Sequence, residues 1–389
     1  MLRITNTESG IVRGLPGTDA RITVFKGIPY AASTEGKNRW REPQPAEKWQ
    51  GIRNCYEFGP ITMQKIPGED PEAFYSKEWH VDPEVPMGED SLRLNIWTPA
   101  KSAEERLPVM MWIFGGAFKE GYAHEMEFDG ERIASRGVIL VSVAYRVNVF
   151  GFLAHPDLTA EAPEAPTNFG LLDQRYAMGW IRRNIANFGG DPENVTIFGQ
   201  SAGGGSVWAH LCSPKAQGAF QKAIPESAAG VNFTYPLTGH HSRCKLKEAE
   251  ALGADFLKQW LGCDTIEQAR ALDAGFIEKK FLESGLAMGP VVDGVYQVDD
   301  SSEIIRKGRM MQVPIMTGNT TNEFVVGPGS QNAAEAEQWV RENFGPYAAE
   351  YLDICKRLAE EKRIPLAEAV SVGTFELGVQ LALECLKEQ

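Results

Sequence analysis

The sequence contains no long hydrophobic run, and this absence excludes the simplest form of membrane insertion. Nowhere do about 18 apolar residues follow one another, which is the length that a membrane-spanning helix needs. The first residues, MLRITNTESGIVRG, also contain none of the apolar core that a signal peptide has. We therefore expect neither a secretion signal nor a membrane partner.

Cysteine and basic charge are scarce as well. The six cysteines are scattered over 389 residues without a C-x-x-C pair, a spacing that indicates reduced, packed thiols and hence a cytoplasmic protein. The 39 Lys and Arg are outnumbered by 52 Asp and Glu, which gives a net charge of −13. Nucleic acids and anionic membranes select for basic patches, so neither is expected as a partner.

Short apolar runs, rich in Val and Ile and closed by glycine or polar residues, predict buried strands. They lie at residues 108–114, 137–145, 194–199 and 313–318. Residues 92–98 predict a further strand. Two alternating runs within residues 8–30, around GIVRG and ITVFKGIPY, predict an antiparallel hairpin at a sheet edge.

Helical patterns separate these runs. Apolar residues recur at helical spacing over 171–190, where the pattern ends at Gly189, and again over 367–389. Strands that alternate with helices predict an α/β fold with a mainly parallel central sheet, an N-terminal antiparallel hairpin and helices on both faces. We expect one domain over residues 1–389, with helices at 230–290 inserted on top of the sheet.

One serine stands between two glycines in 199-GQSAG-203, directly after the predicted strand 194–199. A G-x-S-x-G motif between a strand and a helix is typical of the nucleophile elbow, a tight turn that exposes the serine hydroxyl. The backbone of Ser201 is expected to be strained, and the first N–H groups of the new helix favour negative charge. The alternative interpretation is a glycine-rich turn with an incidental serine.

A second glycine-rich segment, 114-FGGAF-118, follows the predicted strand 108–114. Acyl transfer places negative charge on the former carbonyl oxygen, and backbone N–H groups aimed at that oxygen lower the barrier. Together with the residue after the serine, this segment can form a three-donor oxyanion hole. The alternative is a simple turn that ends the strand.

With these motifs the chain resembles the type B carboxylesterases, the cholinesterase-like branch of the α/β-hydrolase fold. The segments that carry the resemblance are FKGIPYA (25–31), MGEDSLRLNIWTP (87–99), WIFGGAF (112–118), AYRVNVFGFL (144–153), NFGLLDQRYAMGWIRRNIANFGGDPENVTIFGQSAGG (168–204) and TGNTTNEF (317–324). They extend over nearly the whole chain.

The resemblance implies a role for each matching residue. Ser201 matches the nucleophile of the family, and Glu323 matches the acid that orients its histidine. The matching oxyanion donors are Gly116, Ala117 and Ala202. Ser227 resembles a serine that lies near the acid. The resemblance further implies structural ion pairs that involve Glu89, Arg146 and Asp173.

Two departures from the family pattern bear on the site and its environment. Phe114 stands where the family usually has His or Tyr, and it supplies no oxyanion donor. Thr62 and Ser91 stand where secreted members carry a paired cysteine, which agrees with a cytoplasmic location.

The catalytic base is missing from its expected place. In this fold the histidine follows the acid along the chain, but no histidine follows His241, and Glu323 lies beyond it. The six histidines are His80, His124, His155, His210, His240 and His241. His210 is about 13 Å along a helix from Ser201, too far for a hydrogen bond. His240 and His241 have no third ligand at a useful spacing for a metal.

We therefore expect a serine carboxylic-ester hydrolase by lineage, truncated at its C-terminus before the last strand and the histidine loop. It would act on a small-molecule ester through an acyl-Ser201 intermediate, without a cofactor or a metal. With the histidine absent, weak or no activity is expected from this form. A non-catalytic binding protein on the same fold is the alternative, and amidase or peptidase chemistry, like the oligomeric state, stays open.

Overall fold

The computed structural model describes residues 1–72, 76–77, 82–230, 244–321, 323 and 325–387. These residues form two compact units. The first comprises Met1–Pro225, Cys244–Asp299 and Met311–Met316, and the second comprises Glu226–Arg243, Asp300–Met310 and Thr317–Gln389. The single domain expected over 1–389 stays a prediction.

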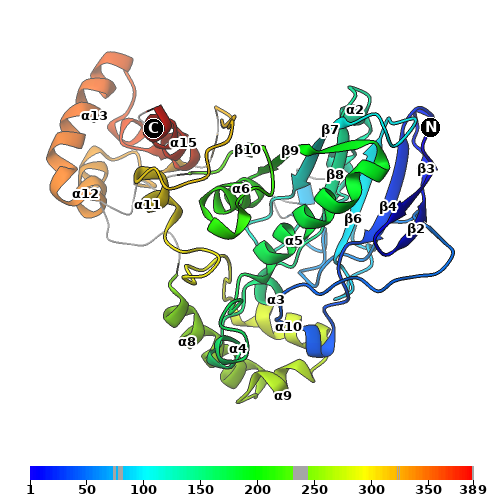
Figure 1. Ribbon diagram of the computed structural model, residues 1–389. Coiled ribbons are helices and arrows are strands. Elements are labelled where there is room, and N and C mark those ends of the chain that lie inside the picture. The colour runs from blue at the N-terminus through cyan, green and yellow to red at the C-terminus, as the bar shows by residue number, and fades with distance from the viewer. Residues whose placement is uncertain (73–75, 78–81, 231–243, 322, 324, 388–389) are drawn as a thin grey trace. The chain divides into compact units, whose positions relative to one another are not determined.

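A seven-stranded sheet is the centre of the first unit (Figure 1). Its strands, in spatial order, are β10 (Lys222–Glu226), β9 (Gly190–Gln200), β7 (Leu107–Ile113), β8 (Ile139–Val143), β6 (Arg93–Thr98), β4 (Thr23–Pro29) and β3 (Leu15–Pro16). Strand β7 pairs in parallel with β8 and β9, whereas β6 is antiparallel to both β8 and β4. The sheet is therefore mixed, with its parallel strands buried in the middle.

The strands predicted at 92–98, 108–114, 137–145 and 194–199 are β6, β7, β8 and β9. The run at 313–318 forms only isolated bridges, from Ile315 to Ala223 and from Gly318 to Glu226, so its prediction as a regular strand was wrong. Pro314 in its middle has no N–H to give to a ladder.

The N-terminal hairpin has a different partner from the one predicted. Strand β4 pairs with the two residues of β3 at the sheet edge. The GIVR run is β2 (Gly10–Arg13), which instead joins β1 (Ile4–Thr7) and β5 (Ile52–Asn54) in a separate three-stranded sheet. An alternating pattern shows that a strand has one buried face, but it does not identify its neighbour.

Helices cover both faces of the central sheet because the chain reverses its direction of winding. From β7 it crosses through α2 (Glu131–Ala134) to β8 on one side, and from β8 through α5 (Phe169–Asn184) to β9 on the other. Right-handed crossovers in opposite directions place their helices on opposite faces. Helix α6 (Ala202–Cys212) follows β9 and lies beside α5 (Figure 1). This arrangement confirms the predicted α/β class.

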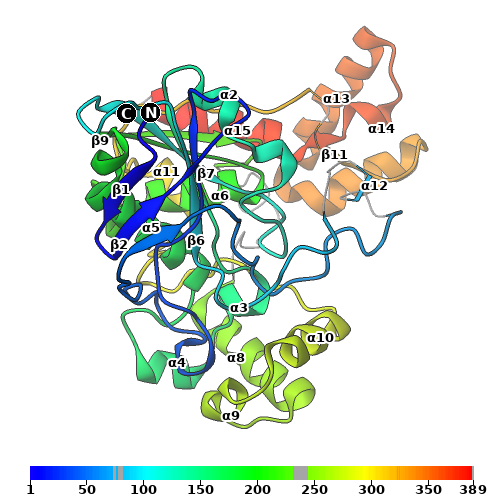
Figure 2. The same cartoon turned by 90° about the vertical axis from the view of Figure 1, so that its right-hand side faces the viewer.

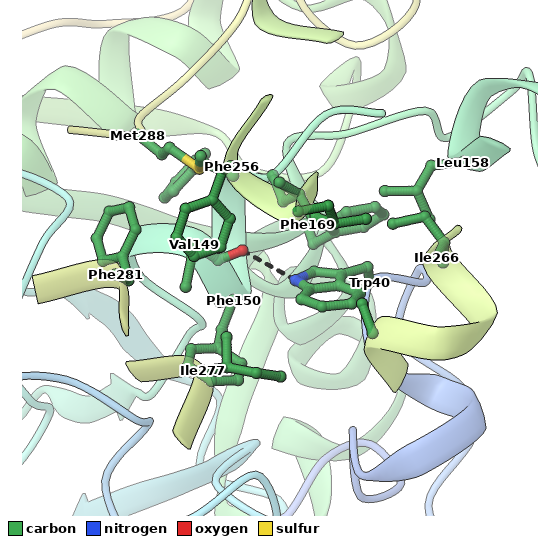
Figure 3. Packing of buried hydrophobic residues seen from close by; sticks show 14 of the residues in the cluster. Trp40, Val149, Phe150, Leu158, Phe169, Phe256, Ile266, Ile277, Phe281 and Met288 are labelled. Atoms are coloured by element: carbon green, nitrogen blue, oxygen red, sulfur yellow. Dashed lines mark hydrogen bonds between the residues drawn. The ribbon is translucent and has the colours of Figure 1, made fainter. Parts of the chain in front are cut away.

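A cluster of short helices gathers at one end of the first unit (Figures 1 and 2). They are α3 (Asn148–Phe152), α4 (Pro156–Glu161), α8 (Leu246–Phe256) with a π-turn (Leu257–Leu261), α9 (Ile266–Arg270) and α10 (Ala274–Ser284). Their apolar faces meet in one core around Phe150, Phe169 and Phe281, where the indole N–H of Trp40 donates to the carbonyl of Val149 at 2.9 Å (Figure 3). Helices are thus present within the expected insertion 230–290, of which residues 231–243 lie outside the described part.

The second unit has a core of its own. Its elements are α11 (Ser301–Arg306), β11 (Val325–Val326), α12 (Ala333–Phe344), α13 (Ala348–Lys362), α14 (Leu366–Ala369), β12 (Val372–Gly373) and α15 (Thr374–Lys387). Val340, Leu352 and Val370 pack together between α12, α13 and α14. The helix predicted over 367–389 is divided, because β12 pairs with β11 before α15 begins. Within the described residues, no helix has the length and apolar character of a membrane span.

Candidate active site

Ser201 stands at the turn between β9 and α6 in a conformation that is unusual for a side chain larger than glycine. Its φ is 56° and its ψ is −120°. Both glycines of the motif are required by close packing: a Cβ on Gly199 would lie 2.6 Å from the carbonyl oxygen of Ile113, and one on Gly203 would lie 2.0 Å from it. The strained turn expected at 199–203 is therefore present, and the end of β7 packs directly against it.

The segment after β7 approaches this turn. A Cβ on Gly115 would lie 3.3 Å from the Cβ of Ser201 and 2.8 Å from the carbonyl oxygen of Gln200. Positive φ angles follow at Gly116 (104°), Ala117 (55°) and Phe118 (61°). Two successive non-glycine residues in this region represent stored strain, which is common where a backbone is shaped for a ligand.

The backbone amides of Gly116, Ala117 and Ala202 have no acceptor within the part of the chain that the structure describes. The carbonyl of Gly116, by contrast, is bonded within its own segment: it accepts hydrogen bonds from the amides of Lys119 and Glu120 at 2.9 and 3.2 Å. Amides without an internal partner, beside a serine at a helix N-terminus, can bind an oxygen that carries negative charge. The three expected donors thus belong to segments that meet at Ser201.

Phe114 lies behind this segment. Its ring is buried and stacks on Tyr145, with ring centroids 4.1 Å apart, and the Tyr145 hydroxyl donates to the Phe114 carbonyl at 2.7 Å. The side chain that departs from the family pattern therefore supports the end of β7.

Glu323 belongs to the second unit and is held there by three donors. The Ser227 hydroxyl donates to its Oε1 at 2.6 Å, and the amide and hydroxyl of Thr320 donate to the same oxygen at 2.9 and 3.0 Å. Partial burial raises the pKa of Glu323, but these hydrogen bonds outweigh it, and the net pKa lies below its usual value. Glu323 is thus kept ionised, and all three of these hydrogen bonds go to its Oε1 and none of them to its Oε2.

None of the three histidines within the described residues is arranged as a general base. His155 caps α4, where its Nδ1 accepts from the amide of Asp157 at 3.1 Å. The ring of His124 stacks on Phe58, and burial, together with nearby Lys26, lowers its pKa to about 4. A pKa this low makes the imidazole a weak base near neutral pH. His80, His240 and His241 lie outside the described residues.

His210 is fully engaged in a buried network that the sequence did not reveal. Its Nδ1 lies 2.8 Å from the Tyr296 hydroxyl, and its Nε2 lies 2.7 Å from Oε1 of Gln174. The Gln174 amide donates to Ser206 at 3.1 Å, and the Ser206 hydroxyl donates to the Ala202 carbonyl at 3.1 Å. The only sequence signal was the presence of polar residues on helix faces that are otherwise apolar. This network supports the first turn of α6.

The ion pairs implied by the resemblance are present. Arg146 and Asp173 are buried together, with guanidinium bonds of 2.7 and 2.8 Å to the two carboxylate oxygens. Glu89 pairs with Arg39, also buried, at 2.5 Å. Both pairs connect segments far apart in the chain, which is a structural role.

The sequence is similar to those of known esterases. A model of the carboxylesterase family matches residues 2–346. A fumonisin B1 esterase of Sphingopyxis macrogoltabida is 33% identical, over 97% of this chain and 67% of its own length. A cholinesterase of Mus musculus is 35% identical, over 82% of this chain and 53% of its own. The chain therefore spans between about half and two thirds of the curated relatives it matches.

Solved structures show the same fold. A carboxylesterase of Geobacillus stearothermophilus superposes with a TM-score of 0.74 at 32% identity, over 92% of this chain and 70% of the other. A PNB esterase superposes with a TM-score of 0.72 at 30% identity, over 90% of this chain and 71% of the other. Both neighbours are α/β hydrolases in architecture, which is the fold of the chain described above.

Proposed function

Because this chain belongs to the carboxylesterase family, we propose that it hydrolyses carboxylic esters through an acyl intermediate on Ser201. The observation that carries the proposal is the strained Ser201 at the N-terminus of α6, placed against a loop in which the amides of Gly116 and Ala117 have no acceptor among the described residues. A purely structural turn would require neither feature.

The proposed reaction begins when the Oγ of Ser201 attacks the ester carbonyl carbon and gives its proton to a base. The carbonyl oxygen becomes an oxyanion, and the amides of Gly116, Ala117 and Ala202 are the donors that stabilise it. Each such donor typically contributes about 3–4 kcal/mol to lowering the barrier. The alcohol then leaves with the proton, and water repeats the sequence to release the acid. Glu323 is proposed to orient the base and to stabilise its charge.

None of the histidines within the described residues is placed to act as the general base of this reaction. His210 has both ring nitrogens engaged, His155 caps a helix, and His124 is buried with a low pKa. We therefore expect the rate of this 389-residue chain to depend on an added base. Free imidazole has the right pKa and is small enough to approach the half-buried Ser201.

The test is hydrolysis of p-nitrophenyl butyrate over a series of imidazole concentrations. Since imidazole cleaves activated esters by itself, Ser201→Ala protein in the same buffer is the matched control. We expect a rate above that control, rising with imidazole. Equal rates in the two proteins at every concentration would refute the esterase proposal and favour a binding protein on the same fold.

The proposed substrate class and location have separate support. The names of the relatives, among them a cocaine esterase, denote enzymes that act on small-molecule esters. No disulfide within the described residues joins Cys55, Cys244, Cys263, Cys355 or Cys385, which fits a reducing compartment such as the cytoplasm. The net charge of −13 makes nucleic acid an unsuitable partner.

A further inference from the structure

The first turn of α6 consists of residues that stabilise a helix poorly. Gly203, Gly204 and Gly205 follow Ala202 directly, and glycine has the lowest helix propensity of any residue except proline. The oxyanion donor proposed at Ala202 therefore stands at the start of a turn whose own sequence does not keep it rigid. Such a donor works best when it is fixed before the substrate arrives, because it then needs no reorganisation during the reaction.

One face of α6 carries the side chains that hold this turn. Ala202, Ser206 and His210 are spaced by four residues and therefore lie one above the other along the helix. Gln174 of α5 contacts both polar members of this row: its Oε1 lies 2.7 Å from Nε2 of His210, and its Nε2 donates to Oγ of Ser206 at 3.1 Å. All three polar side chains are fully buried, so water cannot replace a hydrogen bond that is lost here.

The direction of each hydrogen bond in this row follows from the chemistry of its two groups. An amide oxygen can only accept, so Nε2 of His210 must donate its proton to Gln174. In the neutral ring Nδ1 is then an acceptor, and the Tyr296 hydroxyl donates to it at 2.8 Å. Burial raises the pKa of Tyr296, which keeps that proton on the hydroxyl. Because the Ser206 hydroxyl donates to the Ala202 carbonyl at 3.1 Å, all these bonds run in one direction and end on the first residue of α6.

We propose that His210 is a positioning residue for the reaction at Ser201, and that its Nε2–H tautomer sets the direction of the whole chain of donors. This inference rests on the proposed function. With the opposite tautomer, the Gln174 amide would have to turn its oxygen away from His210 and toward Ser206. The Ser206 hydroxyl would then donate to Gln174 and release the Ala202 carbonyl. Aligned hydrogen bonds also strengthen one another, so the complete chain holds the glycine-rich turn more firmly than the last bond alone.

Ser206→Ala removes the last bond of the chain, and Ser142→Ala in β8 is its matched control. Both serines are buried, and each accepts from a side-chain amide, Ser206 from Gln174 at 3.1 Å and Ser142 from Asn95 at 3.0 Å. Hydrolysis of p-nitrophenyl butyrate is measured with imidazole present. Since complete loss of one oxyanion donor lowers kcat by about 10²–10³-fold, we expect the displaced donor in Ser206→Ala to lower kcat about tenfold or more with KM little changed. The control should keep the kcat of wild type, and equal kcat in the two variants would overturn the proposal.

Two substitutions of His210 separate the roles of its ring nitrogens. The side-chain amide of glutamine can take the place of Nε2–H, whereas that of the shorter asparagine reaches only the position of Nδ1. We expect His210→Gln to keep kcat close to that of wild type, and His210→Asn to lower it as Ser206→Ala does. The reverse order, or an equal loss in both, would contradict the tautomer and the positioning role.

If no hydrolysis depends on Ser201, the proposed function fails, but hydrogen exchange followed by mass spectrometry still tests this inference. Backbone amides over residues 202–206 should exchange faster in Ser206→Ala and His210→Asn than in wild type, and at the wild-type rate in Ser142→Ala. Unchanged exchange in Ser206→Ala would overturn the proposal whether or not the chain is an esterase.

Discussion

Gly203 is the position at which the elbow should tolerate the least change, and Gly203→Ala tests the close packing of this turn. The new methyl carbon would lie 2.0 Å from the carbonyl oxygen of Ile113 and 2.9 Å from that of Phe114. Both are backbone atoms, one at the last residue of β7 and the other at the residue that follows it. They cannot rotate away as the end of a side chain could, so the turn and β7 must separate.

The size of the effect follows from two opposed contributions. Replacing glycine by alanine inside a helix favours folding by about 1 kcal/mol, and overpacking of a tight interior costs about 1–3 kcal/mol or more. Gly205→Ala gains the same helix propensity, but its methyl meets the Phe118 ring only at 3.6 Å. The difference in unfolding free energy between the two variants therefore isolates the clash. We expect Gly203→Ala to be the less stable by about 1–3 kcal/mol.

Thermal unfolding followed by circular dichroism measures this difference. The expected order of midpoints is Gly205→Ala at or above wild type, and Gly203→Ala several degrees below it. Equal midpoints for the two alanine variants would refute the reasoning, because they would show that the turn has room for a side chain at 203.

Three further changes test other parts of the structure. Asp173→Asn leaves the buried Arg146 without its counter-charge and should cost about 3–5 kcal/mol in chemical denaturation. Burial, together with nearby Glu69, raises the pKa of Glu278 from 4.5 to about 7. Between these two pH values the folded state holds a proton that the unfolded state releases, so the free energy of unfolding falls as the pH rises from about 4.5 towards 7. Glu278→Gln should therefore raise the thermal midpoint more at pH 8 than at pH 5. Ser227→Ala removes a donor from the Glu323 carboxylate, so its lowered pKa should rise, and the acid limb of any Ser201-dependent rate should move to higher pH.

The central strands were predictable because burial on both faces produces a continuous apolar run. Strands β6 to β9 and helix α5 appear where the sequence patterns indicate them. Elements at the sheet edge were harder to predict, since a strand of two residues such as β3 has no detectable hydrophobic pattern. The pairing partner of a strand is also not encoded in its local sequence. The run at 313–318 had the composition of a strand, but it forms only isolated bridges.

The candidate site likewise has parts that the sequence predicts and parts that it does not. The Ser201 elbow and the Gly-Gly-Ala segment are local motifs, and the structure places them beside each other, with the backbone strain that was expected at Ser201. The network of His210, Gln174 and Tyr296 joins three distant segments, so no local motif could predict it.

The identity of the nucleophile is the central claim, and covalent labelling tests it most directly. Wild-type and Ser201→Ala protein would be incubated with a fluorophosphonate in the presence of imidazole, and the product examined by intact-mass spectrometry and peptide mapping. We expect one adduct per wild-type chain, located on Ser201, and none in the variant. An unmodified wild-type chain, or an adduct on another residue that persists in Ser201→Ala, would contradict it.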